Sequence, residues 1–291
     1  MSLTSILVNH IFKKSDNKRD KDFTTPIDIL RYDDIVYGDD SKWQILDVYR
    51  PKDKEGKLPV IVSVHGGGWV YGDKQRYQYY CMSLAQHGFV VVNFTYRLAP
   101  KYKHPSQLED TVKVFNWLLD HSDEYGFDID NVFGVGDSAG GHLLALFSCL
   151  CTNKEYADKY DFKVKNNFMP KAIALNCGVY QINMNEKGML RNLMKDLLPN
   201  KGDTKEMYLV NVLNHINNKF PPTYVMTAVD DFVRNQAPLL IDKLNKEDIK
   251  YKYKVYGDDN NKLAHVFHID IKTDSAKLCN KDECDFFKSF M

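Results

Sequence analysis

The sequence predicts an α/β fold with a mostly parallel central sheet of about eight strands and helices on both faces. Continuous apolar runs rich in β-branched residues recur along the chain, and such runs are typical of strands buried on both faces. Segments with apolar residues at helical spacing lie between several of these runs. Strands that alternate with helices connect by right-handed crossovers into a parallel sheet, which defines the fold class.

The strand and helix candidates follow one another in chain order. Strands are expected at residues 28–37, 44–50, 58–64, 89–95, 132–135, 171–177, 223–229 and 251–256. Helices are expected at residues 106–121, from 142 onward, through 239–244 and near 275–290. The last strand alternates polar with apolar residues, as an exposed edge strand does. Residues 152–168 are polar and are expected to form a surface segment outside the sheet and its helices.

We expect residues 1–291 to form one domain with an insertion at residues 178–220. This segment breaks the strand-helix rhythm and holds two helical patterns, the second opened by a capping box of Asp203 with Glu206. At the edge of the sheet where the parallel strands end, such an insertion would form a small helical cap, and the alternative is a helix pair that only packs. Residues 1–25 could contribute to the cap, although their charged run at 13–22 reads as a solvated connector.

Composition indicates an ordinary globular protein and gives no sign of a nucleic-acid partner. Of the 291 residues, 44% are hydrophobic and 27% are charged, and Lys+Arg and Asp+Glu both number 39. This balance gives no reason to expect a nucleic-acid partner. The first residues lack a basic n-region and no window reaches membrane-spanning length, so we expect a cytoplasmic protein. The six cysteines lack zinc-site spacing and are expected to be reduced thiols.

A glycine-rich turn at residues 136–141, with the sequence GDSAGG, lies between a predicted strand and a predicted helix. A serine at the apex of such a turn, here Ser138, has a strained backbone and an exposed hydroxyl. Gly136 and Gly140 are required because a Cβ at either position would meet the neighbouring strand or helix. This context predicts a nucleophile elbow, in which the neighbouring Asp137 is structural.

A second glycine motif, HGGG at residues 65–68, directly follows the strand expected at 58–64. Successive glycines let backbone N–H groups face a ligand, which is what a developing oxyanion requires. We therefore expect the N–H groups of Gly67, Gly68 and Ala139 to form an oxyanion hole. His65 is interpreted as a residue that fixes this loop through a hydrogen bond.

Serine, acid and histidine candidates occur in the chain order of the α/β hydrolases, each just beyond a predicted strand. In the roles we predict, Ser138 attacks the acyl carbon and His265 is first general base and then general acid. A carboxylate must orient the imidazole and offset its positive charge. From the residues alone, Asp230 and Asp231 are equal candidates for this carboxylate, and His268 competes with His265. A metal site at the two histidines would lack the intervening Glu and a third ligand.

Three motifs together resemble one known family. HGGG at 65–68 followed by Gly72, YRLAP at 96–100 and GDSAGG at 136–141 are similar to the hormone-sensitive-lipase type of α/β hydrolase. This group includes bacterial acetyl esterases and carboxylesterases, and the resemblance covers residues 44–150 most closely. It implies an α/β-hydrolase fold.

The resemblance also bears on the acid and the histidine. Residues 227–234 are similar to the family pattern T-x-x-x-D-x-L-x-D, which places Asp231 at the acidic position. The family histidine precedes Gly-Phe, which favours His265 because Phe267 follows it. The chain departs from the family pattern at Lys101, Phe232, Asn235 and Val266.

The resemblance implies a serine esterase that cleaves short-chain acyl esters, acetyl above all, through an acyl-enzyme and without metal or cofactor. The bulky side chains of Trp69 and Tyr71, near the expected oxyanion loop, are the substrate-binding candidates. The substrate would be a small-molecule or sugar ester, and a homodimer is left open. An amide or formamide hydrolase with the same triad is the first alternative, and a non-catalytic small-molecule-binding homologue is the second.

Overall fold

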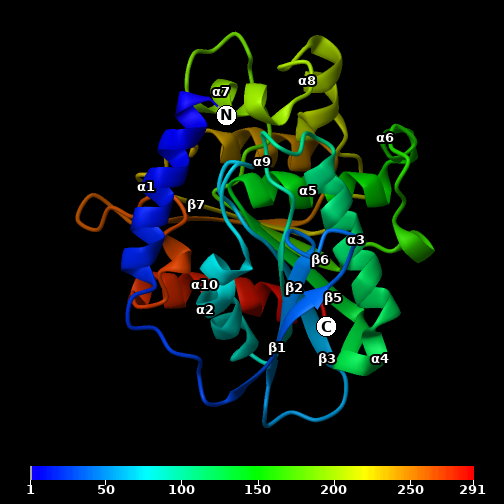
Figure 1. The fold of residues 1–291 in the computed structure, drawn as a ribbon, viewed down its shortest axis with the longest axis vertical. Coiled ribbons are helices and arrows are strands. Elements are labelled where there is room, and N and C mark those ends of the chain that lie inside the picture. Colours follow the sequence, from blue (N-terminus) through cyan, green and yellow to red (C-terminus); the bar gives the residue numbers. More distant parts are fainter. Residues whose placement is uncertain (1) are drawn as a thin grey trace.

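The computed structural model describes residues 2–291. Its centre is one sheet of eight strands in the order β1-β2-β4-β3-β5-β6-β7-β8 (Figure 1). The strands are β1 (Ile29–Val36), β2 (Ile45–Pro51), β3 (Leu58–Val64), β4 (Val90–Thr95), β5 (Phe127–Asp137), β6 (Ala172–Asn176), β7 (Thr223–Ala228) and β8 (Tyr251–Tyr256). β2 pairs antiparallel with both β1 and β4, and all other neighbours pair parallel. The predicted fold class is confirmed.

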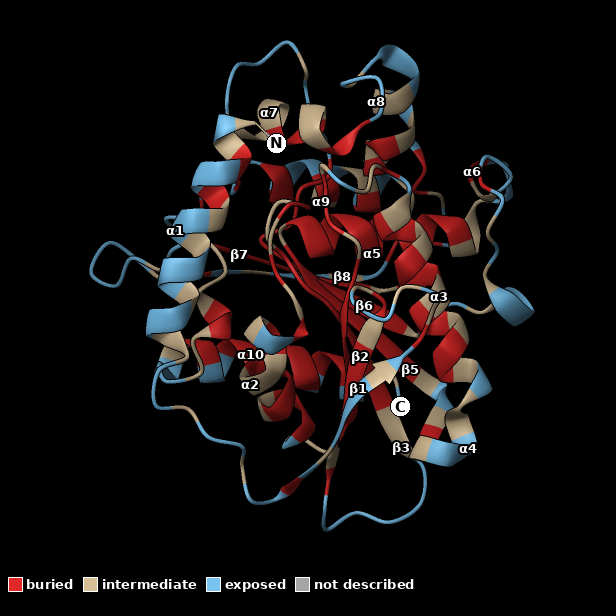
Figure 2. Cartoon of the chain, viewed as in Figure 1, coloured by how far each residue is buried: buried red, intermediate tan, exposed pale blue. Residues whose placement is uncertain are grey.

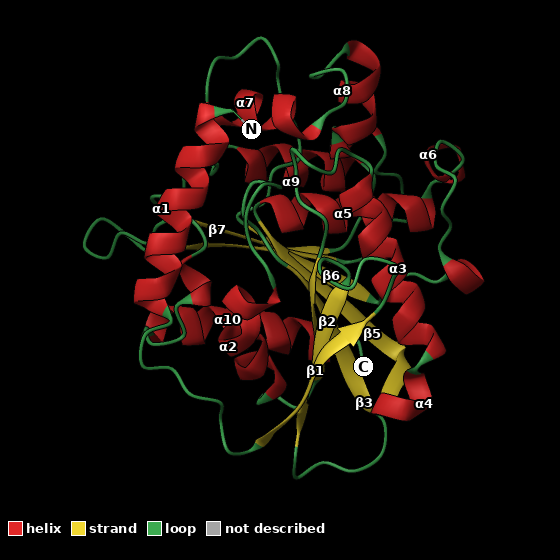
Figure 3. Cartoon of the chain, viewed as in Figure 1, coloured by secondary structure: helices red, strands yellow, loops and turns green. Residues whose placement is uncertain are grey.

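The helices are distributed over both faces of the sheet (Figure 3). They are α1 (Leu3–Arg19), α2 (Lys74–Ala85), α3 (Ser106–Asp120), α4 (Ser122–Tyr125), α5 (Ala139–Thr152), α6 (Lys154–Ala157), α7 (Met189–Leu197), α8 (Thr204–Val210), α9 (Gln236–Lys246) and α10 (Asp274–Lys288). Short 3-10 turns lie at Lys165–Asn167, Val212–Asn214 and Phe267–Ile269. None of the helices within residues 2–291 is long and apolar enough to cross a membrane.

Alternation along the central strands creates two hydrophobic layers. In β3, Val60 and Val62 belong to one hydrophobic cluster together with apolar residues of α3, α5 and α9, whereas Ile61 belongs to a second cluster with those of α2 and α10. Successive strand side chains point to opposite faces, so each central strand must be apolar throughout. Figure 2 shows the result, because the strands at the centre are buried along almost their whole length.

The N-terminal segment differs from its prediction. Residues 13–19 of the charged run are part of α1 and are not a solvated connector. The helix begins at an N-cap, where the Ser2 side chain accepts from the N–H of Ser5, and its inner face packs beside α7. Charged residues fit the helix because Arg19 pairs with Asp16 one turn before it and with the adjacent Asp20.

The inserted segment at 178–220 contains α7, α8 and a 3-10 turn. The predicted capping box is present, since Asp203 accepts from the N–H of Glu206 and the Glu206 carboxylate accepts from the N–H of Asp203. The second helical pattern forms α8, which ends at Val210 and is followed by the 3-10 turn at Val212–Asn214. Both α7 and α8 lie above the upper end of the sheet in Figure 1, and α1 begins beside α7 and runs down one side.

Candidate active site

The turn between β5 and α5 has the backbone of a nucleophile elbow. Ser138 has φ 51° and ψ −117°, a strained conformation for a residue with a Cβ. A Cβ at Gly140 would lie 1.9 Å from the carbonyl oxygen of Val64 in β3, and one at Gly136 would lie 2.6 Å from the carbonyl oxygen of Gly140. Both positions must therefore be glycine, as predicted from the sequence, because backbone carbonyl groups occupy the space that a Cβ would need.

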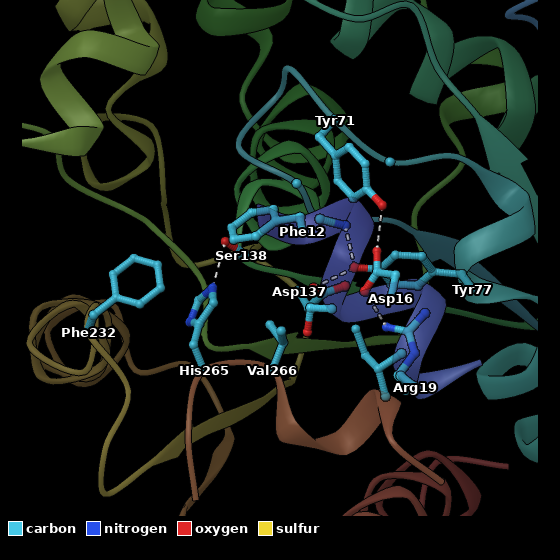
Figure 4. A pocket seen from close by; sticks show the side chains of 15 residues that line it. Phe12, Asp16, Arg19, Tyr71, Tyr77, Asp137, Ser138, Phe232, His265 and Val266 are labelled. Atoms are coloured by element: carbon cyan, nitrogen blue, oxygen red, sulfur yellow. Dashed lines mark hydrogen bonds and ion pairs between the residues drawn. The ribbon is translucent and has the colours of Figure 1, made fainter. Parts of the chain in front are cut away.

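The structure brings Ser138, His265 and Asp231 into one hydrogen-bonded chain. The Ser138 Oγ lies 3.0 Å from His265 Nε2, and His265 Nδ1 lies 2.6 Å from Asp231 Oδ1 (Figure 4). Since a carboxylate only accepts, Nδ1 carries the proton and Nε2 is free to accept from the serine hydroxyl. The imidazole can thus remove the proton of Ser138 and pass it on, while Asp231 holds the ring.

The alternative candidates for the histidine and the acid, His268 and Asp230, lie outside this hydrogen-bonded chain. The His268 side chain is fully buried and packs edge-on against Tyr80, with ring centroids 5.2 Å apart. Burial lowers the pKa of His268 to about 3, so its ring is neutral in the core. The backbone of Asp230 forms a bridge with Ala264, which aligns the two loops whose next residues are Asp231 and His265.

Several donors hold the Asp231 carboxylate. Thr227 Oγ1 donates to Oδ2 at 2.8 Å, and the N–H of Val233 donates to Oδ1 at 3.0 Å. Burial works to raise the pKa of Asp231, but the contacts with His265, Val233 and Thr227 outweigh it, and the net pKa is lowered. The carboxylate is therefore ionised at neutral pH and able to offset a positive charge on the imidazole.

The expected oxyanion donors come from two segments, the loop after β3 and the start of α5. Gly67 and Gly68, in the loop after β3, have positive φ of 110° and 61°. Glycine adopts such backbone angles at no steric cost, because it has no Cβ. Ala139 is the first residue of α5, where the N–H has no partner within the helix. Within residues 2–291, the N–H groups of Gly67, Gly68 and Ala139 donate to no protein acceptor, so all three can receive a ligand oxygen.

A buried network fixes the start of the glycine loop. The N–H of Gly66 donates to the Tyr77 hydroxyl at 2.9 Å, and that hydroxyl donates to Asp137 Oδ2 at 2.8 Å. Burial raises the pKa of Asp137 to about 7, although the hydrogen bond from Tyr77 opposes this. On the other side, His65 Nδ1 donates to the carbonyl of Gly66 at 2.7 Å, which agrees with the predicted loop-fixing role.

Two cavities meet at Ser138. The larger has a volume of about 190 Å³ and is lined by both polar and aromatic residues, among them Phe12, Asp16, Arg19, Tyr71, Tyr77, Asp137, Phe232 and His265 (Figure 4). The smaller has a volume of about 20 Å³, and its walls are apolar apart from Ser138 itself: Val8, Phe12, Gly68, Trp69, Val179, Met189, Leu190, Leu193, Phe232 and Val233. Ser138 thus faces a larger space with polar and aromatic walls and a smaller apolar one.

The two substrate-binding candidates lie in different cavities. Trp69 is 1% exposed, lines the small apolar cavity and packs edge-on against His142. Tyr71 lines the larger cavity, where its hydroxyl donates to Asp16 Oδ2 at 2.8 Å and its ring meets Phe12 edge-on. The sequence pointed to neither Asp16 nor Arg19, since in sequence they belong to an ordinary charged run.

Among residues 2–291, one group of side chains has metal-ligating atoms within 4.8 Å of one another: Cys177, Asp231 and His265. Asp231 and His265 are already hydrogen-bonded to each other. Burial and the nearby Asp231 raise the pKa of the Cys177 thiol well above its ordinary value. Because metals bind the thiolate, these contacts suit a triad better than a metal ligand set.

The fold and this geometry define the chain as an α/β hydrolase with a serine at its nucleophile elbow. The chain belongs to the BD-FAE family, whose sequence model matches residues 46–244. The similarity to hormone-sensitive-lipase-type esterases predicted from the motifs is confirmed by the relatives that follow.

Two curated relatives and one solved structure illustrate the similarity. Versiconal hemiacetal acetate esterase of Dothistroma septosporum is 29% identical over 72% of this chain and 67% of its own length. Esterase LipC of Mycobacterium tuberculosis is 37% identical over 42% of this chain and 30% of its own length. The chain therefore matches between 30% and 67% of the length of these relatives. The crystal structure of an inhibited esterase B from Lactobacillus rhamnosis has a TM-score of 0.88 at 25% identity, covering 99% of this chain and 97% of that one.

Proposed function

We propose that this chain is a carboxylic ester hydrolase that cleaves short-chain acyl esters through an acyl-enzyme on Ser138. The observation that carries the proposal is the hydrogen-bonded chain from Ser138 Oγ through His265 to Asp231, with distances of 3.0 and 2.6 Å. Membership of the BD-FAE family and the esterase names of the relatives support the same activity.

The reaction would proceed in two halves. Ser138 Oγ bonds to the acyl carbon as its proton moves to His265 Nε2, and Asp231 offsets the positive imidazolium. Collapse of the tetrahedral intermediate breaks the bond to the alcohol oxygen, which takes the proton from Nε2. Water then repeats the sequence: it gives a proton to Nε2 as it attacks, and Ser138 recovers that proton when the acid leaves.

The negative oxygen of each intermediate would be bound by the N–H groups of Gly67, Gly68 and Ala139. Each such donor contributes about 3 kcal/mol to the transition state, because it points at a charge that the ester ground state lacks. Tyr77 and His65 support this hole by holding Gly66 from two sides.

The small apolar cavity supports the preference for short acyl groups. Its volume of about 20 Å³ leaves space for little more than a methyl or ethyl group beyond the carbonyl carbon. Trp69 and Leu193, both almost fully buried, close it off. We therefore place the acyl part of the ester in this cavity and the alcohol part in the larger one.

Segments 1–25 and 178–220 together form the proposed cap. α1 contributes Phe12, Asp16 and Arg19 to the larger cavity, and α7 contributes Met189, Leu190 and Leu193 to the smaller one. α1 is tied to α7 where the Ser5 hydroxyl and the N–H of Ser2 donate to Asp196 Oδ2 at 2.5 and 2.7 Å. The cap would thus be built where α1 and α7 pack together and line the two cavities.

The test is covalent labelling of Ser138 combined with an ester series. A fluorophosphonate is expected to label the wild-type protein and not Ser138→Ala, with equal folding of both shown by circular dichroism. Aryl esters should be cleaved fastest as acetate or propionate. An unlabelled folded protein would end the enzyme proposal, a rate that rises steadily to decanoate would end the short-chain part, and faster cleavage of an N-formyl arylamine would favour an amide hydrolase.

A further inference from the structure

An ion pair from the N-terminal helix forms one wall of the larger cavity. Asp16 and Arg19 are one helical turn apart on α1, and both point toward the space beside Ser138 and Asp137 (Figure 4). Their side chains are only 17% and 14% exposed. Charged side chains this well covered are usually held by specific partners, and these two are.

The pair is fixed in place from several directions. Arg19 Nη1 donates to Asp16 Oδ1 at 3.0 Å, and the Tyr71 hydroxyl donates to Asp16 Oδ2 at 2.8 Å. The remaining Arg19 contacts are from Nε and Nη2 to Asp20, at 2.7 and 3.1 Å, and from Nη2 to the carbonyl of Arg76 at 2.6 Å. The two groups therefore present a constant arrangement of charges to the cavity.

This arrangement leaves one donor and one acceptor side by side. A guanidinium has five N–H groups, and the contacts of Arg19 within residues 2–291 use four, which leaves the second N–H of Nη1. Each Asp16 oxygen accepts one hydrogen bond there and can accept another. A hydroxyl group can accept from Nη1 and donate to Asp16 at the same time, whereas a methyl group can do neither.

The charges of the wall also select against anions. Arg19 is paired with both Asp16 and Asp20, so the wall carries no uncompensated positive charge that would bind one. Burial raises the pKa of Asp16, while Arg19 and the hydrogen bond from Tyr71 oppose this. An apolar alcohol here would displace water from two charged groups and return no hydrogen bond, which is unfavourable.

We propose that Asp16 and Arg19 are specificity-determining residues that bind a free hydroxyl on the alcohol part of the ester. The preferred substrates are then short-chain monoesters of diols or larger polyols, in which an unesterified hydroxyl lies near the ester oxygen. The inference rests on the proposed ester hydrolysis at Ser138 and on the placement of the alcohol in the larger cavity.

The test uses two acetates of nearly equal size. 2-Hydroxyethyl acetate and propyl acetate differ in a hydroxyl in place of a methyl group, and their hydrolysis by hydroxide gives the intrinsic reactivity ratio. The wild-type protein should prefer the hydroxy ester in kcat/KM by about tenfold or more beyond that ratio. Asp16→Asn and Tyr71→Phe should reduce the preference several-fold, chiefly by slowing the hydroxy ester. Lys14→Ala, on the exposed side of the same helix, is the matched control and should keep the wild-type ratio.

The outcomes separate this inference from the proposed function. A wild-type ratio equal to the hydroxide ratio overturns the inference and leaves the esterase intact. Equal losses on both acetates in Asp16→Asn also overturn it, because they reveal a structural role for the pair. If neither acetate is cleaved and Ser138 is not labelled by a fluorophosphonate, the esterase proposal itself fails and takes the inference with it.

Discussion

The Tyr77 hydroxyl donates a 2.8 Å hydrogen bond to the buried carboxylate of Asp137, the residue before Ser138. The same hydroxyl accepts from the N–H of Gly66 at 2.9 Å. One phenol on α2 therefore ties the loop after β3 to the loop after β5. The first loop holds two of the proposed oxyanion donors, and the second holds Ser138 and the third donor.

Tyr77→Phe is expected to lower kcat for an aryl acetate by about tenfold with little change in KM, because the oxyanion contacts form mainly in the transition state. Asp137 and the N–H of Gly66 would also lose a buried partner, at a cost of about 1–3 kcal/mol in unfolding free energy. Steady-state kinetics and urea unfolding measure the two effects. Tyr79→Phe, on the same helix with its hydroxyl bonded to Phe23, is the control for kcat. Wild-type kinetics in Tyr77→Phe would show that the loops are held without this bond.

The two adjacent aspartates allow a matched comparison. Asp231→Asn is expected to reduce kcat by about 10⁴-fold, because an amide cannot hold the imidazole in the tautomer that accepts from serine. Asp230→Asn should stay within a few-fold of wild type, since its bridge to Ala264 is made by the backbone. The measurement is aryl acetate hydrolysis with active-site titration by a fluorophosphonate. Comparable losses in both variants would contradict the assignment of Asp231.

Glu283 on α10 makes stability depend on pH. It is fully buried, and its carboxyl contacts Asn176 at 2.6 Å and Tyr80 at 3.2 Å. Burial raises its pKa from the ordinary 4.5 to about 7, although both hydrogen bonds oppose the shift. Between pH 4.5 and 7 the folded protein thus binds this proton more tightly than the unfolded chain, so the stability from Glu283 is present at low pH and lost as pH rises.

Glu283→Gln should remove this dependence. Relative to wild type, the variant should gain on the order of 1–3 kcal/mol in unfolding free energy on going from pH 5 to pH 8. Gln retains both contacts, because its carbonyl can accept from Asn176 while its amide donates to Tyr80. Urea unfolding at the two pH values measures the difference, and subtracting wild type cancels groups such as His268. A difference that does not change with pH would show that Glu283 is ionised throughout this range.

Much of the fold could be predicted because its signals are local. β3 occupies the predicted residues 58–64, since a strand buried on both faces has to be apolar throughout. α2 was not predicted, because its buried face includes Lys74, Tyr77 and Tyr80 beside smaller apolar residues, and this mixture does not form a clear apolar stripe in the sequence. β5 begins earlier than expected, at Phe127, because its first residues pair with Leu58 and Pro59 before an irregularity in the register.

The candidate site, too, was predicted only in part from the sequence. Ser138 and its glycines could be predicted from one turn, because the strain and the close backbone approach are encoded within a few residues. The bonds from Tyr71 to Asp16 and from Tyr77 to Asp137 join residues 55 and 60 positions apart. No local pattern encodes such contacts, so the polar wall of the larger cavity emerged only from the packing of α1.

Leu193 provides a test of which cavity holds the acyl group. This α7 residue is 2% exposed, lines the small apolar cavity and has its Cδ1 only 3.0 Å from the position of a Cβ on Gly68. Leu193→Ala removes three carbon atoms from the wall, so the fastest aryl ester should shift from acetate toward butyrate or hexanoate. The acetate rate itself should fall only a few-fold, since the triad and the glycine loop keep their contacts.

The truncation is expected to cost about 2–5 kcal/mol of unfolding free energy, which urea unfolding can verify alongside the chain-length series. Leu239→Ala, at a partly exposed position on α9, serves as the control that leaves the chain-length profile unchanged. If Leu193→Ala is folded and still prefers acetate by the wild-type margin, the acyl group does not enter this cavity. The assignment of acyl and alcohol parts to the two cavities would then have to be reversed, and with it the role of the Asp16–Arg19 wall.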